Sequence, residues 1–372
     1  MNTARPVLRP GRDADAAGFI RVIGECWSEY PGCVIDIDGE APELHALASH
    51  CAKRGGAVWV AEADGEMAGL VCAYPSTDGA WELAKMYVAR QWRGSGVATE
   101  LLGSAQAYAR ARDAERMVLW SDTRFDRAHR FYEKCGFVRV GPLRVLADKS
   151  NSIEFGYAKP LAGIVVERLD AAGAVSAEIS LARILIACVD TGASVSFLPP
   201  LAPDTARGFW HRVAGGVARG ETVLLAAWLD GEMVGTVQLD LATPENQPHR
   251  ADLAKMLVHP GARRHGIGRL MLARAEAESL TAGRSLLTLD TLAGDAGERL
   301  YRMAGWTECG RIPGYALNAD RIPSDTVLFY KELVSDCIRP TDPRAHSAGQ
   351  HPVAAPAGRS RARLPVSDTS TG

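Results

Sequence analysis

The 372-residue sequence has no excess of either charge and no long apolar run. Its 42 basic and 44 acidic side chains leave a formal net charge of −2, which gives no general attraction to nucleic acid or to an anionic membrane. The apolar run at Val223–Leu229 is far shorter than the roughly 20 residues that span a bilayer. The N-terminal segment lacks the apolar stretch of a signal peptide. We therefore expect a cytoplasmic protein with neither a nucleic-acid partner nor a membrane partner.

Closely spaced cysteine pairs are also missing. The eight cysteines are scattered along the chain, and none forms a C-x-x-C pair. This spacing argues against a disulfide framework and against a structural zinc site, so we expect no metal. Hydrophobic residues make up 47% of the sequence, which is enough to bury a core, and 372 residues predict at least two domains.

The sequence repeats itself once. LAKMYV at Leu83–Val88 returns as LAKMLV at Leu253–Val258. DGEM at Asp64–Met67 occurs again at Asp230–Met233, and FYEKCGF is echoed later in the chain by LYRMAGW. Three matches in the same order, at an interval of roughly 170 residues, indicate a tandem duplication rather than a short-period repeat protein.

Each copy contains the pattern of a β-hairpin followed by a β-α-β-α-β unit. In the first copy, strands are expected at residues 57–63 and 69–74, on either side of an Asp-Gly turn. An Ala- and Leu-rich helix follows a Gly-rich loop, and a shorter helix that carries a tyrosine ends at Gly136, or at Gly305 in the second copy. The fold class predicted is α/β (α+β): two tandem domains, each a mixed, mostly antiparallel twisted sheet flanked by helices.

The boundary between the copies is expected near Pro160–Gly163. This places one domain at residues 1–160 and another at residues 161–337. The remaining segment, 338–372, is rich in Pro, Arg, Ser and Ala and has no apolar periodicity, which predicts a disordered tail. A basic docking segment for an acidic partner is the alternative.

Two strand–loop–helix units follow the repeated strand, at Met86–Leu102 and Met256–Leu272. In each unit a glycine-containing turn with neighbouring arginines stands at a helix N-terminus. Free backbone N–H groups and the helix dipole bind anions there, and glycine lets the backbone approach a diphosphate closely. The dinucleotide and P-loop patterns are both absent. These loops differ from an ordinary glycine turn by the pattern R-x-x-G-x-[GA] after an M-x-V strand, which occurs in both copies.

RGSGVA at residues 93–98, the strand before it and the YEKCGF element resemble the GNAT superfamily of acyl-CoA N-acyltransferases. The resemblance covers nearly all of residues 5–335 as two consecutive domains. The second copy is similar to the tabtoxin-resistance acetyltransferase group, for example through TGASVSF at residues 191–197 and the long segment at 311–331. The resemblance implies acetyl-CoA as the acyl donor and a small-molecule amine as the acceptor.

The sequence departs from the family pattern in both copies. Arg264 stands where the second loop commonly has glycine, so any left-handed turn there must be made by a residue with a side chain. An asparagine often opens the tyrosine helix in the family, whereas this chain has Phe125 and Gly294 at those places.

The resemblance also implies the site residues. Tyr132 and Tyr301 stand where the family places the general acid that protonates the departing thiolate. Glu82 and Asp252, each four residues before the M-x-V methionine, can take a proton from the amine through an ordered water. Backbone N–H groups of the M-x-V strands can polarise the thioester carbonyl. The residues expected to bind the acyl donor are Met86, Tyr87, Val88, Arg93, Gly94, Ser95, Gly96, Val97, Ala98, Thr99, Met256, Leu257, Val258, Arg263, Arg264, His265, Gly266, Ile267, Gly268 and Arg269.

Several of these residue types also have ordinary structural roles. The two tyrosines can be buried aromatic residues, and the two carboxylates can be solvated groups at strand ends. Cys135 has no His/Asn partner pattern and is interpreted as helix-end packing. Trp27, Tyr30 and Trp81 either line an acceptor pocket or pack in the core.

The function expected is direct acetyl transfer from acetyl-CoA to a small amine, such as an antibiotic-like toxin, with both copies competent. One alternative is an acyl-CoA-binding regulatory module in which one domain is degenerate. Another is a protein acetyltransferase that acts on lysines or N-termini. The sequence leaves the acceptor and the oligomeric state open.

Overall fold

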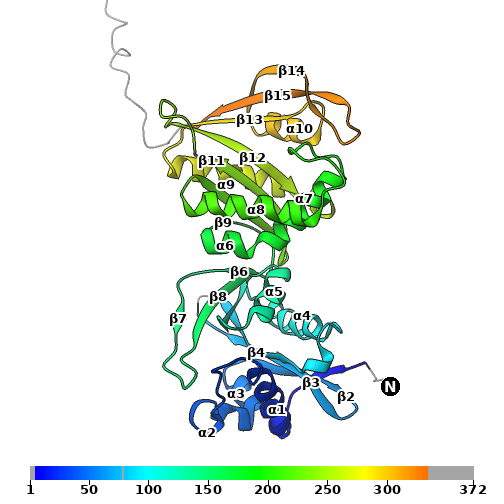
Figure 1. Ribbon diagram of the computed structural model, residues 1–372, viewed down its shortest axis with the longest axis vertical. Coiled ribbons are helices and arrows are strands. Elements are labelled where there is room, and N and C mark those ends of the chain that lie inside the picture. The colour runs from blue at the N-terminus through cyan, green and yellow to red at the C-terminus, as the bar shows by residue number, and fades with distance from the viewer. Residues whose placement is uncertain (1–4, 78, 334–372) are drawn as a thin grey trace, which may run out of the picture. The chain divides into compact units, whose positions relative to one another are not determined.

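The computed structural model describes residues 5–77 and 79–333, which form two β-sheets covered by helices (Figure 1). All strands of one sheet lie before residue 161, and all strands of the other lie after residue 163. We call residues 5–160 the first half and residues 161–333 the second half. The fold class predicted from the sequence, two mixed and mostly antiparallel sheets flanked by helices, is confirmed.

The two halves pack together as one unit that extends to Leu333. The division into domains at residues 1–160 and 161–337 therefore stays a proposal, supported by the separation of the two sheets. The tail expected at residues 338–372 lies outside the described residues. Within the described ranges, no helix combines the length and the apolar character that a membrane span requires.

The first sheet has the strand order β1-β2-β3-β4-β5-β8-β6, with β7 also paired to β8. Only β4 and β5 run parallel to each other. Its strands are β1 (Val7–Pro10), β2 (Ala57–Ala63), β3 (Glu66–Pro75), β4 (Ala80–Val88), β5 (Arg116–Asp122), β6 (Val138–Arg139), β7 (Arg144–Val145) and β8 (Ile153–Pro160).

Helices cover both faces of this sheet. The α1 and α3 helices pack on one face, and α4 and α5 pack on the other (Figure 1). The helices are α1 (Ala16–Trp27), α2 (Ile37–Glu40), α3 (Leu47–Lys53), α4 (Val97–Arg110) and α5 (Asp126–Lys134). Because both faces are buried, strands such as β3 are apolar at almost every position rather than at every second one.

The second sheet has the order β14-β15-β13-β12-β11-β10-β9, with a single parallel pair, β12 and β13. Along β10, residues such as Leu224 and Trp228 pack with α6, α7 and α8, whereas Val223 and Leu225 pack with α9 and α10. Its strands are β9 (Ile164–Leu169), β10 (Thr222–Leu229), β11 (Glu232–Asp240), β12 (Arg250–Val258), β13 (Leu286–Leu292), β14 (Thr307–Leu317) and β15 (Pro323–Glu332). Its helices are α6 (Ala171–Ser176), α7 (Glu178–Asp190), α8 (Pro203–Ala218), α9 (Ile267–Thr281) and α10 (Ala296–Met303).

The central strands of each sheet diverge at the same point. β4 is paired with β5 only over Ala80–Glu82, and β12 is paired with β13 only over Arg250–Asp252. Just beyond, each central strand is bulged against its antiparallel neighbour, and the bulge holds a lysine with positive φ, 50° at Lys85 and 51° at Lys255. The remainder of each strand, which contains the M-x-V sequence, therefore has an edge free of ladder partners within the described residues.

Candidate active site

The Gly-rich loop of the first half ends at the N-terminus of α4. Gly94 and Gly96 have φ values of 77° and 93°, and Gly96 is the residue that caps the helix. The helix geometry leaves the N–H groups of Val97, Ala98 and Thr99 without a helical acceptor. Free N–H groups at a helix N-terminus, together with the helix dipole, suit an anion; that this loop binds one stays a prediction.

The second loop has the same backbone path. Arg264 has a φ of 72° and Gly266 one of 81°, and α9 begins directly after Gly266. Arg264 therefore adopts the left-handed conformation of Gly94 despite its side chain, as expected from the alignment of the two copies. Arg264, His265 and Arg269 are all exposed, so the two guanidinium charges are available to a ligand at this loop.

The first arginine of each loop binds the protein rather than open solvent. Arg93 donates from Nε to the Val88 carbonyl at 3.0 Å and from Nη1 to the Glu29 carboxylate at 2.7 Å. Arg263 donates in the same way to the Val258 carbonyl at 3.3 Å, and its Nη2 donates to Thr191 at 3.1 Å. Both arginines thus tie the loop to the end of the M-x-V strand, a role that the sequence alone does not indicate.

A cavity of about 910 Å³ in the first half brings most of the predicted groups together. It is lined by Glu82, by the M-x-V residues of β4 and by Tyr132 of α5. The loop residues that line it are Arg93, Gly94, Gly96, Ala98 and Thr99. Residues that are 50 positions apart in the chain meet here because β4 and β5 diverge after Glu82.

Tyr132 is 7% exposed, and its ring lies against Phe137 and Tyr157. Burial raises the pKa of its hydroxyl, and the neighbouring Tyr87 and Tyr157 raise it further. Within the described part of the chain, no group forms a hydrogen bond with this hydroxyl. A protonated hydroxyl at a cavity wall can donate a proton to a departing anion.

Glu82 lies at the point where β4 leaves β5. Its carboxylate accepts a hydrogen bond from the Tyr74 hydroxyl at 3.3 Å, and Tyr74 itself lies under the guanidinium of Arg54. No ion pair involves Glu82 among the described residues. A carboxylate that faces a cavity without a cationic partner is free to act as a base.

The corresponding carboxylate of the second half is engaged. Asp252 is paired with Arg250, two residues earlier on the same strand, and it also accepts a hydrogen bond from Thr288. Tyr301 resembles Tyr132: it is 6% exposed, it packs on Trp306, and burial raises its pKa. The second half thus keeps the tyrosine but binds the carboxylate to a cation.

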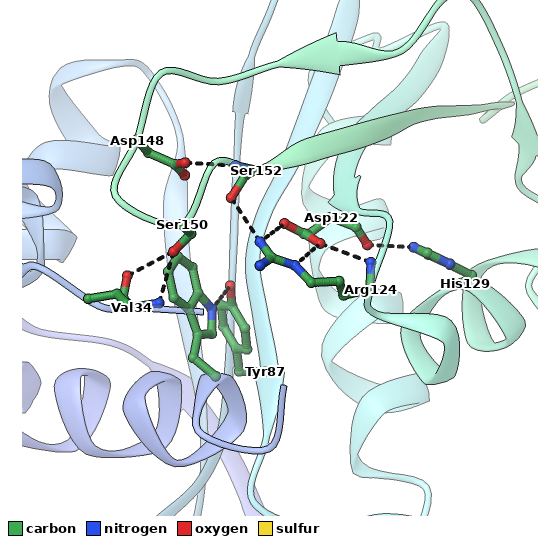
Figure 2. A network of polar contacts seen from close by, with 9 residues as sticks. Val34, Tyr87, Asp122, Arg124, His129, Asp148, Ser150 and Ser152 are labelled. Carbon is green, nitrogen blue, oxygen red and sulfur yellow. Dashed lines mark hydrogen bonds and ion pairs between the residues drawn. The ribbon is translucent and has the colours of Figure 1, made fainter. Parts of the chain in front are cut away.

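A network of polar contacts lies beside the first-half cavity, whose lining includes Tyr87, Asp122 and Ser152 (Figure 2). Trp27 donates from Nε1 to the Tyr87 hydroxyl at 2.8 Å, so the proton of that hydroxyl is free to point elsewhere. Arg124 binds both carboxylate oxygens of Asp122, at 2.8 and 2.6 Å, and Asp122 accepts from His129 through its carbonyl. Tyr87 has no counterpart in the second half, where Leu257 stands at its place.

Two segments join above this network. The Ser150 hydroxyl accepts from the Val34 N–H at 2.8 Å and donates to the Val34 carbonyl at 3.1 Å (Figure 2). Lys149, beside Ser150, is paired with Asp36. The segment between α1 and α2 is thereby linked to the segment between β7 and β8. The sequence contains no local signal for this link, because the partners are more than 100 residues apart.

The sequence allows two roles for the aromatic residues Trp27, Tyr30 and Trp81, lining an acceptor pocket or packing in the core, and their places in the structure differ. Trp27 and Tyr30 line the cavity together with Phe125, whose ring centroid lies 4.7 Å from that of Tyr30. Trp81, in contrast, is 5% exposed and packs in the core against Tyr108. Cys135 lies at the C-terminal end of α5, and burial raises the pKa of its thiol, which agrees with a packing role.

Among the described residues, no group of three or more His, Cys, Asp and Glu side chains is arranged to hold a metal ion.

Comparison with known sequences identifies relatives of one kind. The sequence profile of the "Acetyltransferase (GNAT) family" matches residues 22–137 and again residues 196–306. An uncharacterized N-acetyltransferase from the hisH-hisA intergenic region of Azospirillum brasilense is 30% identical over 138 residues, which are 37% of this chain and 76% of that protein. An aminoglycoside N(6')-acetyltransferase type 1 of Stenotrophomonas maltophilia is 32% identical over 148 residues, covering 37% of this chain and 89% of that protein.

Solved structures of similar fold each cover less than half of this chain. The yncA protein of Salmonella typhimurium, solved with its cofactor acetyl-CoA, is 16% identical, with a TM-score of 0.39, over 47% of this chain and 97% of its own. A ribosomal-protein-alanine N-acetyltransferase of Brucella melitensis is 23% identical, with a TM-score of 0.39, over 45% of this chain and 99% of its own.

Proposed function

This chain belongs to the GNAT family of acetyltransferases, and from that premise we propose that it transfers the acetyl group of acetyl-CoA to a primary amine of a small molecule. We propose further that the first half performs the reaction. The observation that carries the proposal is the single cavity lined by the anion-binding loop, the free strand edge, Glu82 and Tyr132.

The loop at Arg93–Thr99 supports the proposal that acetyl-CoA is the acyl donor. Its exposed N–H groups and the N-terminus of α4 suit the diphosphate of CoA, and the positive φ of Gly94 lets the backbone approach closely. Arg93 supports this path by holding the loop to the Val88 carbonyl. The unpaired edge of β4, which begins beyond Glu82, supplies N–H groups for the thioester carbonyl; one such donor is worth about 3 kcal/mol.

The acceptor amine must lose a proton before it attacks. An ordinary alkylamine has a pKa near 10.4 and is therefore protonated at neutral pH. Glu82 takes this proton through a water. The amine nitrogen then bonds to the acetyl carbon, and the bond between that carbon and the CoA sulfur breaks. Tyr132 gives its hydroxyl proton to the departing thiolate, and the second proton of the acylated nitrogen, passed through water, restores that hydroxyl and leaves a neutral amide. The exchange needs no covalent enzyme intermediate.

The acceptor we propose is a cationic small amine. Glu82 lines the cavity without an ion-pair partner among the described residues, which favours a positively charged ligand beside it, whereas other lining carboxylates such as Asp122 and Glu154 are paired with arginines. The aromatic rings of Trp27, Tyr30 and Phe125 add an apolar wall. The relative from Stenotrophomonas maltophilia, named for acetylation of an aminoglycoside, supports an acceptor of this class.

For the second half we propose binding of acetyl-CoA with little turnover. Its loop retains the backbone path of an anion site, but Asp252 is paired with Arg250. This proposal departs from the expectation that both copies are competent, and it shares one degenerate domain with the regulatory-module alternative.

The test is acetylation of a mixed amine library by the full-length protein with acetyl-CoA, read by mass spectrometry. We expect a mass increase of one acetyl group on cationic small amines, and no increase on peptide lysines or N-termini offered in the same mixture. The control is the protein with Tyr132→Phe and Glu82→Gln combined. Modification of the peptides alone would contradict the proposal and favour a protein acetyltransferase.

A further inference from the structure

The helix that carries Tyr132 ends against the second half. Three carbonyls at or just beyond the C-terminal end of α5 receive side-chain donors. Trp228 of β10 donates from Nε1 to the Gly136 carbonyl at 3.1 Å, and Ser180 of α7 donates to the Glu133 carbonyl at 3.3 Å. Lys159, in the first half itself, donates to the Cys135 carbonyl at 2.8 Å. Two of the three donors therefore come from the second half.

Trp228 lies next to a β-bulge. The register of β10 and β11 shifts between Ala227 and Trp228, where β11 has one extra residue, and the register of β2 and β3 shifts at the corresponding place in the first half, between Ala61 and Glu62. The residue that faces the bulge differs between the copies. Trp228 is fully buried between the halves, in a core cluster that also includes Val138 of the first half, whereas Glu62 is paired with Arg9 near the surface. Both copies thus have a bulge at this place, but the residue beside it is buried between the halves in the second copy and lies near the surface in the first.

The Asp-Gly turns that follow these bulges differ in the same way. A Cβ atom added at Gly65 would meet nothing within 4 Å, although one added at Gly231 would lie 2.9 Å from Arg110 Nη2 and 3.1 Å from the Pro160 carbonyl oxygen. Arg110 also donates to the Asp230 carbonyl at 2.9 Å. The Asp230–Gly231 turn therefore packs against the first half, whereas the Asp64–Gly65 turn has free space around its glycine.

The end of α10, the helix that carries Tyr301, accepts fewer side-chain hydrogen bonds from the described residues than the end of α5 does. The Ala304 carbonyl receives Lys331, as Cys135 receives Lys159, but in the described residues no side chain donates to the Gly305 carbonyl. Met303, near that end of α10, is 80% exposed. Among residues 5–77 and 79–333, therefore, a tyrosine-helix end bound by donors from the other half is found in the first half alone.

We propose that Trp228 and the β10–β11 turn of the second half are positioning elements for Tyr132 of the first half. This inference rests on the proposed function, because it assumes that Tyr132 donates the proton. Tyr132 lies on the last turn of α5, so the carbonyls that Trp228 and Ser180 hold fix the helix end and, with it, the hydroxyl. A displacement of about 1 Å at a reacting group can cost about 100-fold in rate.

The first test is Trp228→Phe in the full-length protein, which keeps an aromatic ring but removes the N–H donor. We expect kcat for acetyl transfer to fall about tenfold while the KM for acetyl-CoA stays unchanged, because the loop at Arg93–Thr99 is untouched. The matched control is Trp210→Phe, since Trp210 is also fully buried in the second half but its Nε1 has no partner there. A kcat for Trp228→Phe within twofold of that of Trp210→Phe would overturn the inference.

A second test uses the repeated turn. Gly231→Ala and Gly65→Ala impose the same backbone strain, since the φ values are 86° and 79°, but only Gly231→Ala pushes the turn away from the first half. We expect kcat to fall in Gly231→Ala and to stay near wild type in Gly65→Ala, again with an unchanged KM for acetyl-CoA. Equal values of kcat in the two variants would contradict the inference.

Tyr132→Phe separates this inference from the proposed function. If Tyr132→Phe lowers kcat and Trp228→Phe does not, the proposed function stands and the positioning role is wrong. If Tyr132→Phe leaves kcat unchanged, the proton donor itself is wrongly assigned, and the positioning role falls with it.

Discussion

Glu82 and Asp252 occupy the same position in the two sheets but have different partners. Each is the last residue at which the central strand pairs with its parallel neighbour. Glu82 accepts a single hydrogen bond, from Tyr74, whereas Asp252 is held by both Arg250 and Thr288. The guanidinium of Arg250 occupies the position beside Asp252 that a cationic amine would need, so the two halves differ at the carboxylate for which we propose the base role.

The first prediction concerns this pair of carboxylates. Glu82→Gln should lower kcat for amine acetylation by about 100-fold, because the amide cannot accept the proton of the attacking amine. Asp252→Asn should leave kcat within twofold of wild type. Steady-state rates with one shared acceptor provide the measurement, and an equal loss in both variants would show that both halves turn over.

The second prediction concerns the tyrosines. Tyr132→Phe removes one hydroxyl and little volume, so acetyl-CoA affinity should survive while kcat falls by about 100-fold. Tyr301→Phe should leave kcat unchanged, since its half lacks a free base. Full activity in the double variant would exclude tyrosine as the proton donor.

The third prediction concerns pH. Burial raises the pKa of Tyr132, so its hydroxyl stays protonated above the ordinary tyrosine pKa of about 10. On the alkaline side, kcat should therefore show no decline from about pH 8 to about pH 10. A lowered pKa would produce the opposite result, a decline within that range. Measuring kcat against pH for wild type and for Tyr132→Phe distinguishes the two, since only a decline that is absent from the variant belongs to Tyr132.

The fourth prediction concerns the loops. Gly94→Ala should lower the free energy of unfolding by about 1 kcal/mol, because alanine at positive φ is strained even where space is open. Arg264→Gly should raise the free energy of unfolding, since glycine at this positive φ removes the strain that a side chain causes. Urea unfolding of the full-length protein measures both. Gly103→Ala, in the middle of α4 at an exposed site, is the control and should stabilise the protein.

The sequence predicted the parts of each half that repeat. The strand expected at residues 57–63 is β2, and both Gly-rich loops stand at helix N-termini. The helices that precede the hairpins, such as α1 and α7, were not predicted, because these segments share little sequence between the copies. A local signal nevertheless exists for α1, because its buried residues Phe19, Val22, Ile23 and Cys26 have the spacing of one helix face.

The partners of the site residues were predictable only where they are close in sequence. Arg250 and Asp252 are two residues apart on a strand, so their side chains share one face, and this signal was present in the sequence. Glu29 and Arg93 are 64 residues apart, and no periodicity connects them. Phe125 was recognised as a departure from the family pattern, but its stacking on Tyr30 depends on the fold.

The hydrogen bond from Trp228 to the Gly136 carbonyl joins residues 92 positions apart, and this separation has a consequence for synthesis on the ribosome. At about 5 to 20 residues per second, the indole is made roughly 5 to 20 seconds after the helix end that it binds. During that interval the end of α5 in the nascent first half lacks this donor. On the positioning role proposed above, the first site is completed only once β10 has been translated, although every residue that lines its cavity has been translated before that strand.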